Sequence, residues 1–135
     1  MKWMLDTDTC IAIIKGDPAR ALKRLRAKAV GQVGLSSITL SELHYGAAKS
    51  NRASESRAAL AEFVVALELA PFDESAAHHY GPLRATLSRR GTPIGPLDTL
   101  IAAHALALDV VLVTHNVKVF SRAPGLRVED WLKEP

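Results

Sequence analysis

Short apolar segments of strand character alternate with helical segments along this chain, and this alternation restricts its possible folds more than any other feature. Continuous apolar runs at residues 2–6, 30–35 and 110–114 have the length of buried strands. Apolar side chains recur at helical spacing over residues 39–49, 54–68, 75–89 and 97–108. Strands without a polar face are typical of parallel sheets that helices cover on both sides. The sequence therefore predicts an α/β fold with three layers, α/β/α, around a mostly parallel twisted sheet.

Length and composition favour one compact domain spanning residues 1–135. With 135 residues and 48% apolar side chains, roughly two-thirds of the chain's surface can be buried, which is enough for a core without disulfides. The single cysteine, Cys10, cannot form an internal disulfide, and no apolar run approaches the roughly 18 residues that a membrane span needs. The first residues show neither a long apolar stretch nor a small-residue cleavage site. We expect a cytoplasmic protein with no membrane partner.

The basic side chains are concentrated near the N-terminus. The chain carries 17 Lys and Arg against 14 Asp and Glu, a net charge of +3, which permits a nucleic-acid partner without requiring one. A helix opened by Pro18 is predicted to carry most of a basic cluster. The basic cluster consists of Lys15, Arg20, Lys23, Arg24, Arg26 and Lys28. It forms either a solvated helix face or a ridge that contacts phosphates.

Acidic and amide side chains fall where a parallel sheet of this kind places its functional site. Asp6 and Asp8 follow the first strand, Asn116 follows the last clear one, and Glu42 and Asp98 lie in the first turns of predicted helices. Because sites in open parallel sheets lie beyond the carboxyl ends of the strands, these side chains can converge. Clustered carboxylates raise one another's pKa unless a divalent cation neutralises them. Oxygen ligands favour Mg²⁺, or Mn²⁺, over zinc.

Each of these acids also has a structural interpretation. The run 39–42 fits a capping box in which Glu42 reaches back to a backbone N–H. Asp98 could serve the dipole of its helix, and Asp8 could serve a turn or a helix cap. Asp6 is harder to explain in this way, because a carboxylate that ends an apolar strand costs burial energy unless it is paired or binds a metal.

Read in order, five blocks of this chain resemble the PIN-domain family, specifically the VapC-type ribonuclease toxins of bacterial toxin–antitoxin pairs. The resemblance covers essentially the whole chain. The blocks are MLDTDTC at residues 4–10, SSITLSELHYG at 36–46, IGPLDTLIAAHA at 94–105, VTHN at 113–116 and PGLRVEDW at 124–131.

The resemblance implies a metal-dependent endoribonuclease that hydrolyses phosphodiester bonds of tRNA, or of other structured or single-stranded RNA, and so inhibits translation. It makes Asp6, Glu42 and Asp98 the ligands, direct or through water, of one or two Mg²⁺ ions. The same three acids and Asn116 form the catalytic set, with Thr7 in support. Asp6 and Asp98 are expected to contact the metal directly, and Glu42 to bind or orient the attacking water.

The resemblance also implies partners. An active nuclease toxin requires a cognate antitoxin, and such toxins commonly form a homodimer or a hetero-oligomer with the antitoxin. One apolar helix face is either part of the core or such an interface, and its periodicity does not separate the two. This face consists of Leu60, Phe63, Val64 and Leu67.

One departure from the family pattern keeps other functions open. Proteins of this kind usually carry a fourth acid at the position of Asn116 or three residues later, where this chain has Val119. The alternative is therefore a catalytically weakened PIN-like module that binds RNA or protein. A further alternative follows from residues 6–9, which resemble the nucleophile motif of haloacid-dehalogenase-type phosphatases. That motif requires a later Lys and a paired acidic motif, and neither is found.

Contacts with RNA would need basic or aromatic side chains around the acids. Tyr45 or Trp3 could stack a base, but aromatic residues make up only 5% of the chain, and this scarcity favours the core for both. The basic cluster could approach the phosphates. A second group of bases could do the same, namely Arg84, Arg89 and Arg90.

Overall fold

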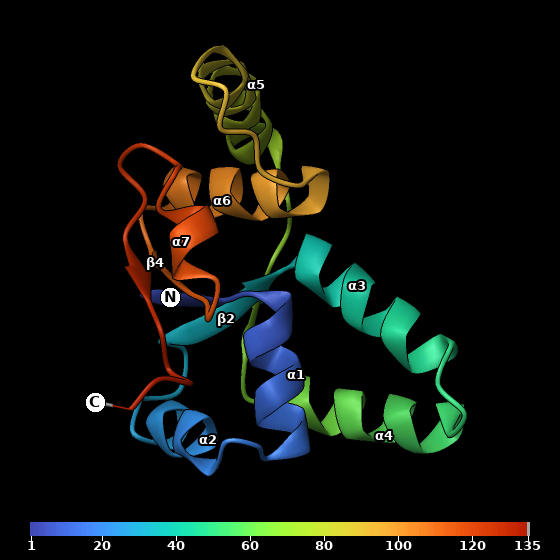
Figure 1. Ribbon diagram of the computed structural model, residues 1–135. Coiled ribbons are helices and arrows are strands. Elements are labelled where there is room, and N and C mark those ends of the chain that lie inside the picture. Colours follow the sequence, from blue (N-terminus) through green and yellow to red (C-terminus); the bar gives the residue numbers. More distant parts are fainter. Residues whose placement is uncertain (135) are drawn as a thin grey trace.

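A computed structural model describes residues 1–134 and shows five strands in one sheet, in the order β3-β2-β1-β4-β5, with every neighbouring pair parallel. Helices lie on both faces (Figure 1), so the predicted three-layer α/β architecture is confirmed. The strands are β1 Trp3–Leu5, β2 Val33–Ser36, β3 Glu68–Ala70, β4 Val111–Val113 and β5 Val128–Glu129. The helices are α1 Thr7–Lys15, α2 Ala19–Arg26, α3 Ser37–Ala48, α4 Ala53–Val64, α5 Glu74–Arg89, α6 Pro96–Leu108 and α7 Val117–Phe120. Within residues 1–134 no helix has both the length and the hydropathy to cross a bilayer.

The central strand β1 divides the core in two. Successive side chains of a strand point to opposite faces, and Met4 accordingly joins a cluster with α5 and α6 while Leu5 joins one with α1 to α4. Both side chains are fully buried. At the end of β1 the amide of Asp6 donates to the carbonyl of Val113 at 2.9 Å. This bond fixes the point where β1 and β4 both stop.

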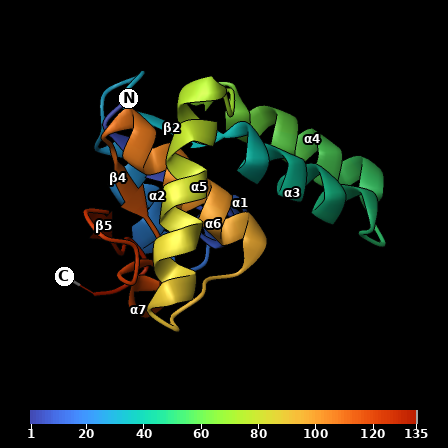
Figure 2. The ribbon, with the colours of Figure 1, turned by 90° about the horizontal axis from the view of Figure 1, so that it is seen from above.

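Helices α3 and α4 form an antiparallel pair that projects from the body of the molecule (Figure 2). The apolar face of α4 belongs to the core, because Leu60 is buried and Phe63 and Val64 pack against the Leu5 cluster together with Leu67. Within the described chain this face therefore contributes to the core, and its part in an interface stays a prediction.

Two element boundaries differ from the sequence-based prediction. The second strand begins at Val33 because residues 29–32 form a turn, in which the amide of Gln32 donates to the carbonyl of Ala29 at 3.1 Å. Residues 117–120 and 128–129 form α7 and β5, which the sequence did not predict. Both are too short to show a hydrophobic period, and β5 exists because it pairs with β4.

Half of the basic cluster holds the C-terminal segment in place. Arg20 donates to the carbonyl of Leu132 at 2.7 Å, and Arg24 donates to the carbonyl of Asp130 at 2.9 Å. The ammonium of Lys28 lies 5.7 Å from the ring centroid of Trp131 in the same segment and 4.2 Å from that of Trp3. These three bases therefore contact a segment distant in sequence rather than forming only a solvated face, and contact with phosphates stays a prediction.

Candidate active site

Asp6 is the most buried acid of the candidate site. It follows β1 directly, its side chain is only 4% exposed, and its Oδ1 accepts a hydrogen bond from the amide of Thr9 at 2.9 Å. Asp6 is therefore the N-cap of α1, and the cap role considered for Asp8 is wrong because Asp8 lies in the first turn of the helix. Burial raises the pKa of Asp6, whereas hydrogen bonds from Thr114 and Thr9 oppose this rise by stabilising the charged form.

Glu42 points toward the start of α1. Helix α3 begins at Ser37, and its N-cap is Ser36, whose Oγ accepts from the amide of Ile38 at 3.1 Å. The predicted capping box at residues 39–42 is therefore wrong, because Glu42 lies too far inside the helix to reach its N-terminal amides. The Oε1 of Glu42 instead accepts a hydrogen bond from the Thr7 hydroxyl at 2.7 Å.

Asp98 lies in the first turn of α6, as predicted, with Pro96 as the first residue of the helix. Its pKa is raised to about 6, first by burial and then by the negative charges of Asp6, Glu42 and Asp8. Charges act in this way only over short distances in a partly buried site. The structure thus brings the three predicted acids, and Asp8 with them, into one electrostatic cluster.

The chemistry of these side chains suits a hard divalent cation. Within residues 1–134 no three His, Cys, Asp or Glu side chains are already gathered so that they could hold a metal ion. Mg²⁺ does not require such a cage, since it commonly keeps several waters and uses one or two carboxylates. The pKa of Asp98 is raised first by burial and then by the negative charges of the neighbouring acids, and a divalent cation would offset the effect of those charges.

The loop after β4 meets the acids through its backbone and through Thr114. The Thr114 hydroxyl accepts from the amide of Asn116 at 2.9 Å and also hydrogen-bonds to the Asp6 carboxylate. The side chain of Asn116 is exposed and does not cap α7. Val119, where relatives are expected to carry an acid, is half-buried in α7. Of the four predicted catalytic residues, the structure therefore draws three into the cluster and leaves the Asn116 side chain at its edge.

Sequence reasoning missed a polar contact that ties two of the site's helices together. The ring Nδ1 of His104, on α6, lies 2.8 Å from Oγ of Ser36, the N-cap of α3. Both residues are buried, and burial lowers the pKa of His104. This contact links the helix of Glu42 to the helix of Asp98. The signal in the sequence is one polar residue, His104, inside an otherwise apolar helical run.

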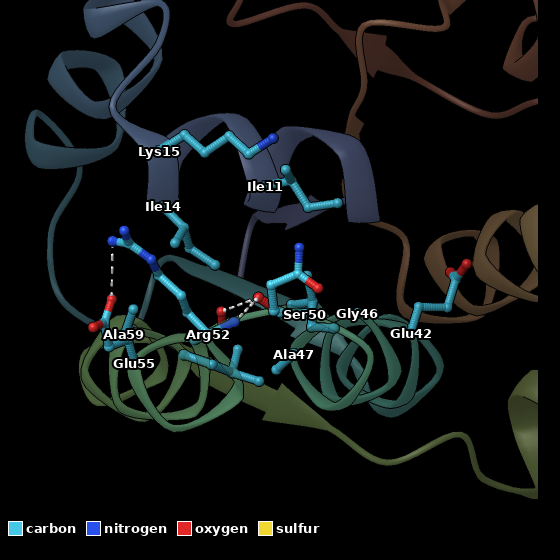
Figure 3. Close-up of a pocket in the computed structure, with 14 residues that line it drawn as sticks. Ile11, Ile14, Lys15, Glu42, Gly46, Ala47, Ser50, Arg52, Glu55 and Ala59 are labelled. Carbon is cyan, nitrogen blue, oxygen red and sulfur yellow. Dashed lines mark hydrogen bonds and ion pairs between the residues drawn. The ribbon is translucent and has the colours of Figure 1, made fainter.

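A groove opens beside Glu42, between α1, α3 and α4. Its volume is about 650 Å³, and in Figure 3 Glu42 lies at one end while Arg52 and Glu55, 3.6 Å apart as an ion pair, lie at the other. The walls between these ends are mainly apolar and come from all three helices. They include Ile11, Ile14, Leu43, Ala47, Ala59 and Leu60.

Comparison with known proteins places this geometry in a family. Residues 3–126 match the family model of the PIN domain. The tRNA(fMet)-specific endonuclease VapC of Salmonella typhimurium is 45% identical over 131 residues, which cover 97% of this chain and 98% of the relative. Ribonuclease VapC2 of Rickettsia felis is 39% identical over 134 residues, which cover 98% of this chain and 100% of the relative.

Solved structures agree with the sequence comparison. DNA-bound VapBC from Salmonella typhimurium contains a chain that is 45% identical, with a TM-score of 0.92 over 97% of this chain and 98% of the other. VapBC2 from Rickettsia felis, bound to a DNA fragment from its promoter, contains a chain that is 38% identical, with a TM-score of 0.91 over 97% and 99%.

The electrostatics of Asp98 predict an effect of its charge on stability. In the folded protein its pKa is about 6, against 3.8 for a free side chain. Folding therefore favours the protonated form, and ionisation of Asp98 progressively weakens the fold as the pH rises from about 4 to about 6. Above that window the penalty is constant. We predict that Asp98→Asn raises the melting temperature near pH 8 in EDTA, and that this advantage shrinks as the pH approaches 4.

Thermal unfolding followed by circular dichroism tests this expectation, with the exposed acid Asp17 as a matched control, since Asp17→Asn should change little. If Asp98→Asn were less stable than the wild type at pH 8, Asp98 would instead be stabilising the helix dipole.

Proposed function

Because this chain belongs to the PIN-domain family, among the VapC ribonuclease toxins of VapBC toxin–antitoxin systems, we propose that it acts as a single-domain, metal-dependent endoribonuclease that cleaves tRNA and so inhibits translation. The observation that carries the metal-dependent chemistry is that Asp98, at the start of α6, lies in the negative field of Asp6, which follows β1, and of Glu42 on α3. A half-buried carboxylate beside other acids costs folding free energy unless a bound cation neutralises the charge.

The residues divide the work of hydrolysis. Asp6 and Asp98 would hold a Mg²⁺ ion, with Mn²⁺ as a substitute, and Asn116 would hydrogen-bond a nearby water from the edge of the site. When bound, the ion lowers the pKa of a coordinated water and stabilises charge on the phosphoryl oxygens. Glu42 has one carboxylate oxygen occupied by the Thr7 hydroxyl. Its other oxygen is then free to orient the attacking water and accept its proton.

The proposed substrate class rests on relatives and on charge. The relatives from Salmonella typhimurium and Shigella flexneri, at 45% and 43% identity, are tRNA(fMet)-specific endonucleases, and this favours tRNA for the present chain. An acidic site repels RNA unless basic side chains surround it. Basic side chains that remain exposed in the structure can serve this role. They are Lys15, Lys23, Arg26, Arg84, Arg89 and Arg90.

One observation favours a second candidate, a PIN-like module that binds RNA or protein but turns over slowly. Val119 stands where the family pattern places a fourth acid, and α7 keeps its side chain half-buried. A single hydrated Mg²⁺ needs no fourth carboxylate, so we favour the enzyme. The phosphatase alternative is dropped, because the chain belongs to the PIN family.

We further propose that an antitoxin encoded by the neighbouring gene inhibits the enzyme by laying an apolar segment into the groove beside Glu42, and that the toxin itself forms a homodimer. The groove has the features of such a docking site: apolar walls, about 650 Å³ of space and one end at the candidate active site. The relatives described above were solved as VapBC assemblies. A segment bound there would cover Glu42 and block access to the acids.

Cleavage of bulk tRNA by purified, antitoxin-free protein tests the proposed reaction. With Mg²⁺ we expect fragments of defined length. With EDTA, which removes the cation, we expect cleavage to fall by about a hundredfold or more, and we expect a similar fall for Asp98→Asn in the presence of Mg²⁺, because this substitution removes a proposed ligand of the cation. Asp17→Asn, a change of the same kind outside the site, should cleave like the wild type.

Cleavage that ignores EDTA would contradict the metal mechanism. Binding of tRNA without any cleavage would favour the binding module over the enzyme.

Substitutions on α4 test the docking groove. Ala59 lines the groove, whereas its neighbour Ala58 is exposed and lies outside it. We predict that Ala59→Arg weakens antitoxin binding at least about tenfold, since a charged side chain would be buried among apolar walls, and that Ala58→Arg binds like the wild type. Calorimetric titration with the antitoxin gives the affinities, and RNA cleavage by the free toxin should be unchanged in both variants. Equal affinities for the two variants would place the antitoxin elsewhere.

A further inference from the structure

Tyr45 is unusual among the aromatic residues of this chain. It is 68% exposed, and within residues 1–134 no other Phe, Trp or Tyr residue is exposed. The sequence-based expectation that Tyr45 belongs to the core is therefore wrong. The other aromatic residues have partners in the fold. Phe120 and Trp131 are buried, Phe72 packs edge-on against His104, and Tyr80 accepts a hydrogen bond from Arg84.

Trp3, the other side chain that sequence reasoning considered for stacking, is already occupied. Its ring has Lys28 at 4.2 Å from the centroid, and its indole N–H donates to Glu129 at 3.1 Å. Trp131 donates to the same carboxylate at 3.2 Å. A nucleobase could reach Trp3 only by breaking these contacts, so Trp3 holds the C-terminal segment, and among the Phe, Trp and Tyr residues that the structure describes the exposed ring is that of Tyr45.

The position of Tyr45 connects it to the candidate active site. It lies on α3 three residues after Glu42, which puts the two side chains about one helical turn apart on neighbouring faces. The ammonium of Lys49 lies 4.9 Å from the centroid of the Tyr45 ring. Lys49 is seven residues after Glu42, close to two full turns, and therefore on the same side of the helix. An acid, an aromatic ring and a base thus follow one another along α3.

We propose that Tyr45 stacks an unpaired base of the RNA substrate next to the scissile phosphodiester, and that Lys49 contacts a neighbouring phosphate. This inference rests on the proposed ribonuclease function and adds a substrate-binding element to it. Proteins that recognise single-stranded or looped RNA combine aromatic side chains, on which nucleobases stack, with basic side chains that contact the phosphates. The Lys49 ammonium lies over one face of the ring, and because Tyr45 is 68% exposed, a nucleobase can stack on the opposite face.

The surroundings of Tyr45 favour RNA over a protein partner. Tyr45 and Lys49 are absent from the walls of the groove proposed for the antitoxin, although Gly46 on the same helix and Ser50, just after its C-cap, line it. The groove is mainly apolar between its ends, whereas the Tyr45 ring has the Lys49 ammonium over it and follows Glu42 by three residues on α3. The Tyr45 ring and the Lys49 ammonium together therefore suit a nucleotide better than an apolar peptide segment.

Affinity measurements with defined RNA test the inference. In an Asp98→Asn background, where cleavage is expected to stop, fluorescence anisotropy gives Kd values for a labelled ten-nucleotide single-stranded RNA. A companion series carries one abasic ribose at each position in turn. We expect Tyr45→Ala to raise Kd about tenfold and Tyr45→Phe to stay within about twofold. The control is Leu108→Ala, which should bind like the parent. Leu108 is an exposed apolar residue at the C-terminal end of α6, away from Asp98 in the first turn.

The abasic series separates stacking from a general loss of structure. For the RNA that lacks the stacked base, Tyr45→Ala should bind no more weakly than its parent, because neither protein can stack there. Lys49→Gln should reduce the salt dependence of binding without changing the abasic pattern. In the background with intact Asp98, Tyr45→Ala should raise KM and leave kcat and the melting temperature nearly unchanged.

Two results would overturn the inference. One is an unchanged RNA affinity for Tyr45→Ala, whether or not antitoxin binding or self-association is weakened. The other is an equal loss of affinity for every abasic RNA. If RNA is cleaved by the wild type in either case, the proposed ribonuclease function stands and only the stacking role falls. If the wild type neither binds nor cleaves RNA, both fall together.

Discussion

A carboxylate buried at the end of the central strand is the constraint on which the rest of this structure depends. Asp6 caps α1, its amide bonds to the carbonyl of Val113 at the end of β4, and its carboxylate hydrogen-bonds to Thr114. Its negative charge helps to raise the pKa of Asp98 at the start of α6. Burying one acid beside others lowers the free energy of unfolding unless a bound cation neutralises their charge. The α/β sheet therefore acts as a scaffold that holds these acids at one edge.

The sequence was sufficient to predict the scaffold and the convergence of the three acids, but not the start of the helix that carries Glu42. Buried strands without a polar face predicted the parallel sheet, and Pro96 predicted the start of α6 with Asp98 in its first turn. The start of α3 was misplaced because several consecutive polar residues could cap it, and only the tertiary contact of Ser36 with His104 selects one. Glu42 therefore seemed to serve its own helix, whereas in the structure it meets Thr7 of another.

The surface was less predictable than the core, because partners distant in sequence decide what remains available. Arg20, Arg24 and Lys28 contact the C-terminal segment, and Lys28 also lies over the ring of Trp3. Composition suggested that both candidate stacking residues are core, yet the structure separates them: Trp3 is engaged and Tyr45 is exposed. No local pattern distinguishes these two rings. The same limit applies to α7 and β5, which exist through contacts with the rest of the fold.

The central claim is that the acids at the end of β1 share a divalent cation, and proton release on metal binding tests it most directly. Because the pKa of Asp98 is about 6, near pH 6 this carboxyl is about half protonated, and a bound cation must displace that proton. Titration calorimetry with Mg²⁺ or Mn²⁺ in buffers of different ionisation enthalpy should give about half a proton released per ion near pH 6 and almost none near pH 8. Asp98→Asn should abolish this release. Metal binding without proton release near pH 6, or no saturable binding by the wild type, would contradict the account.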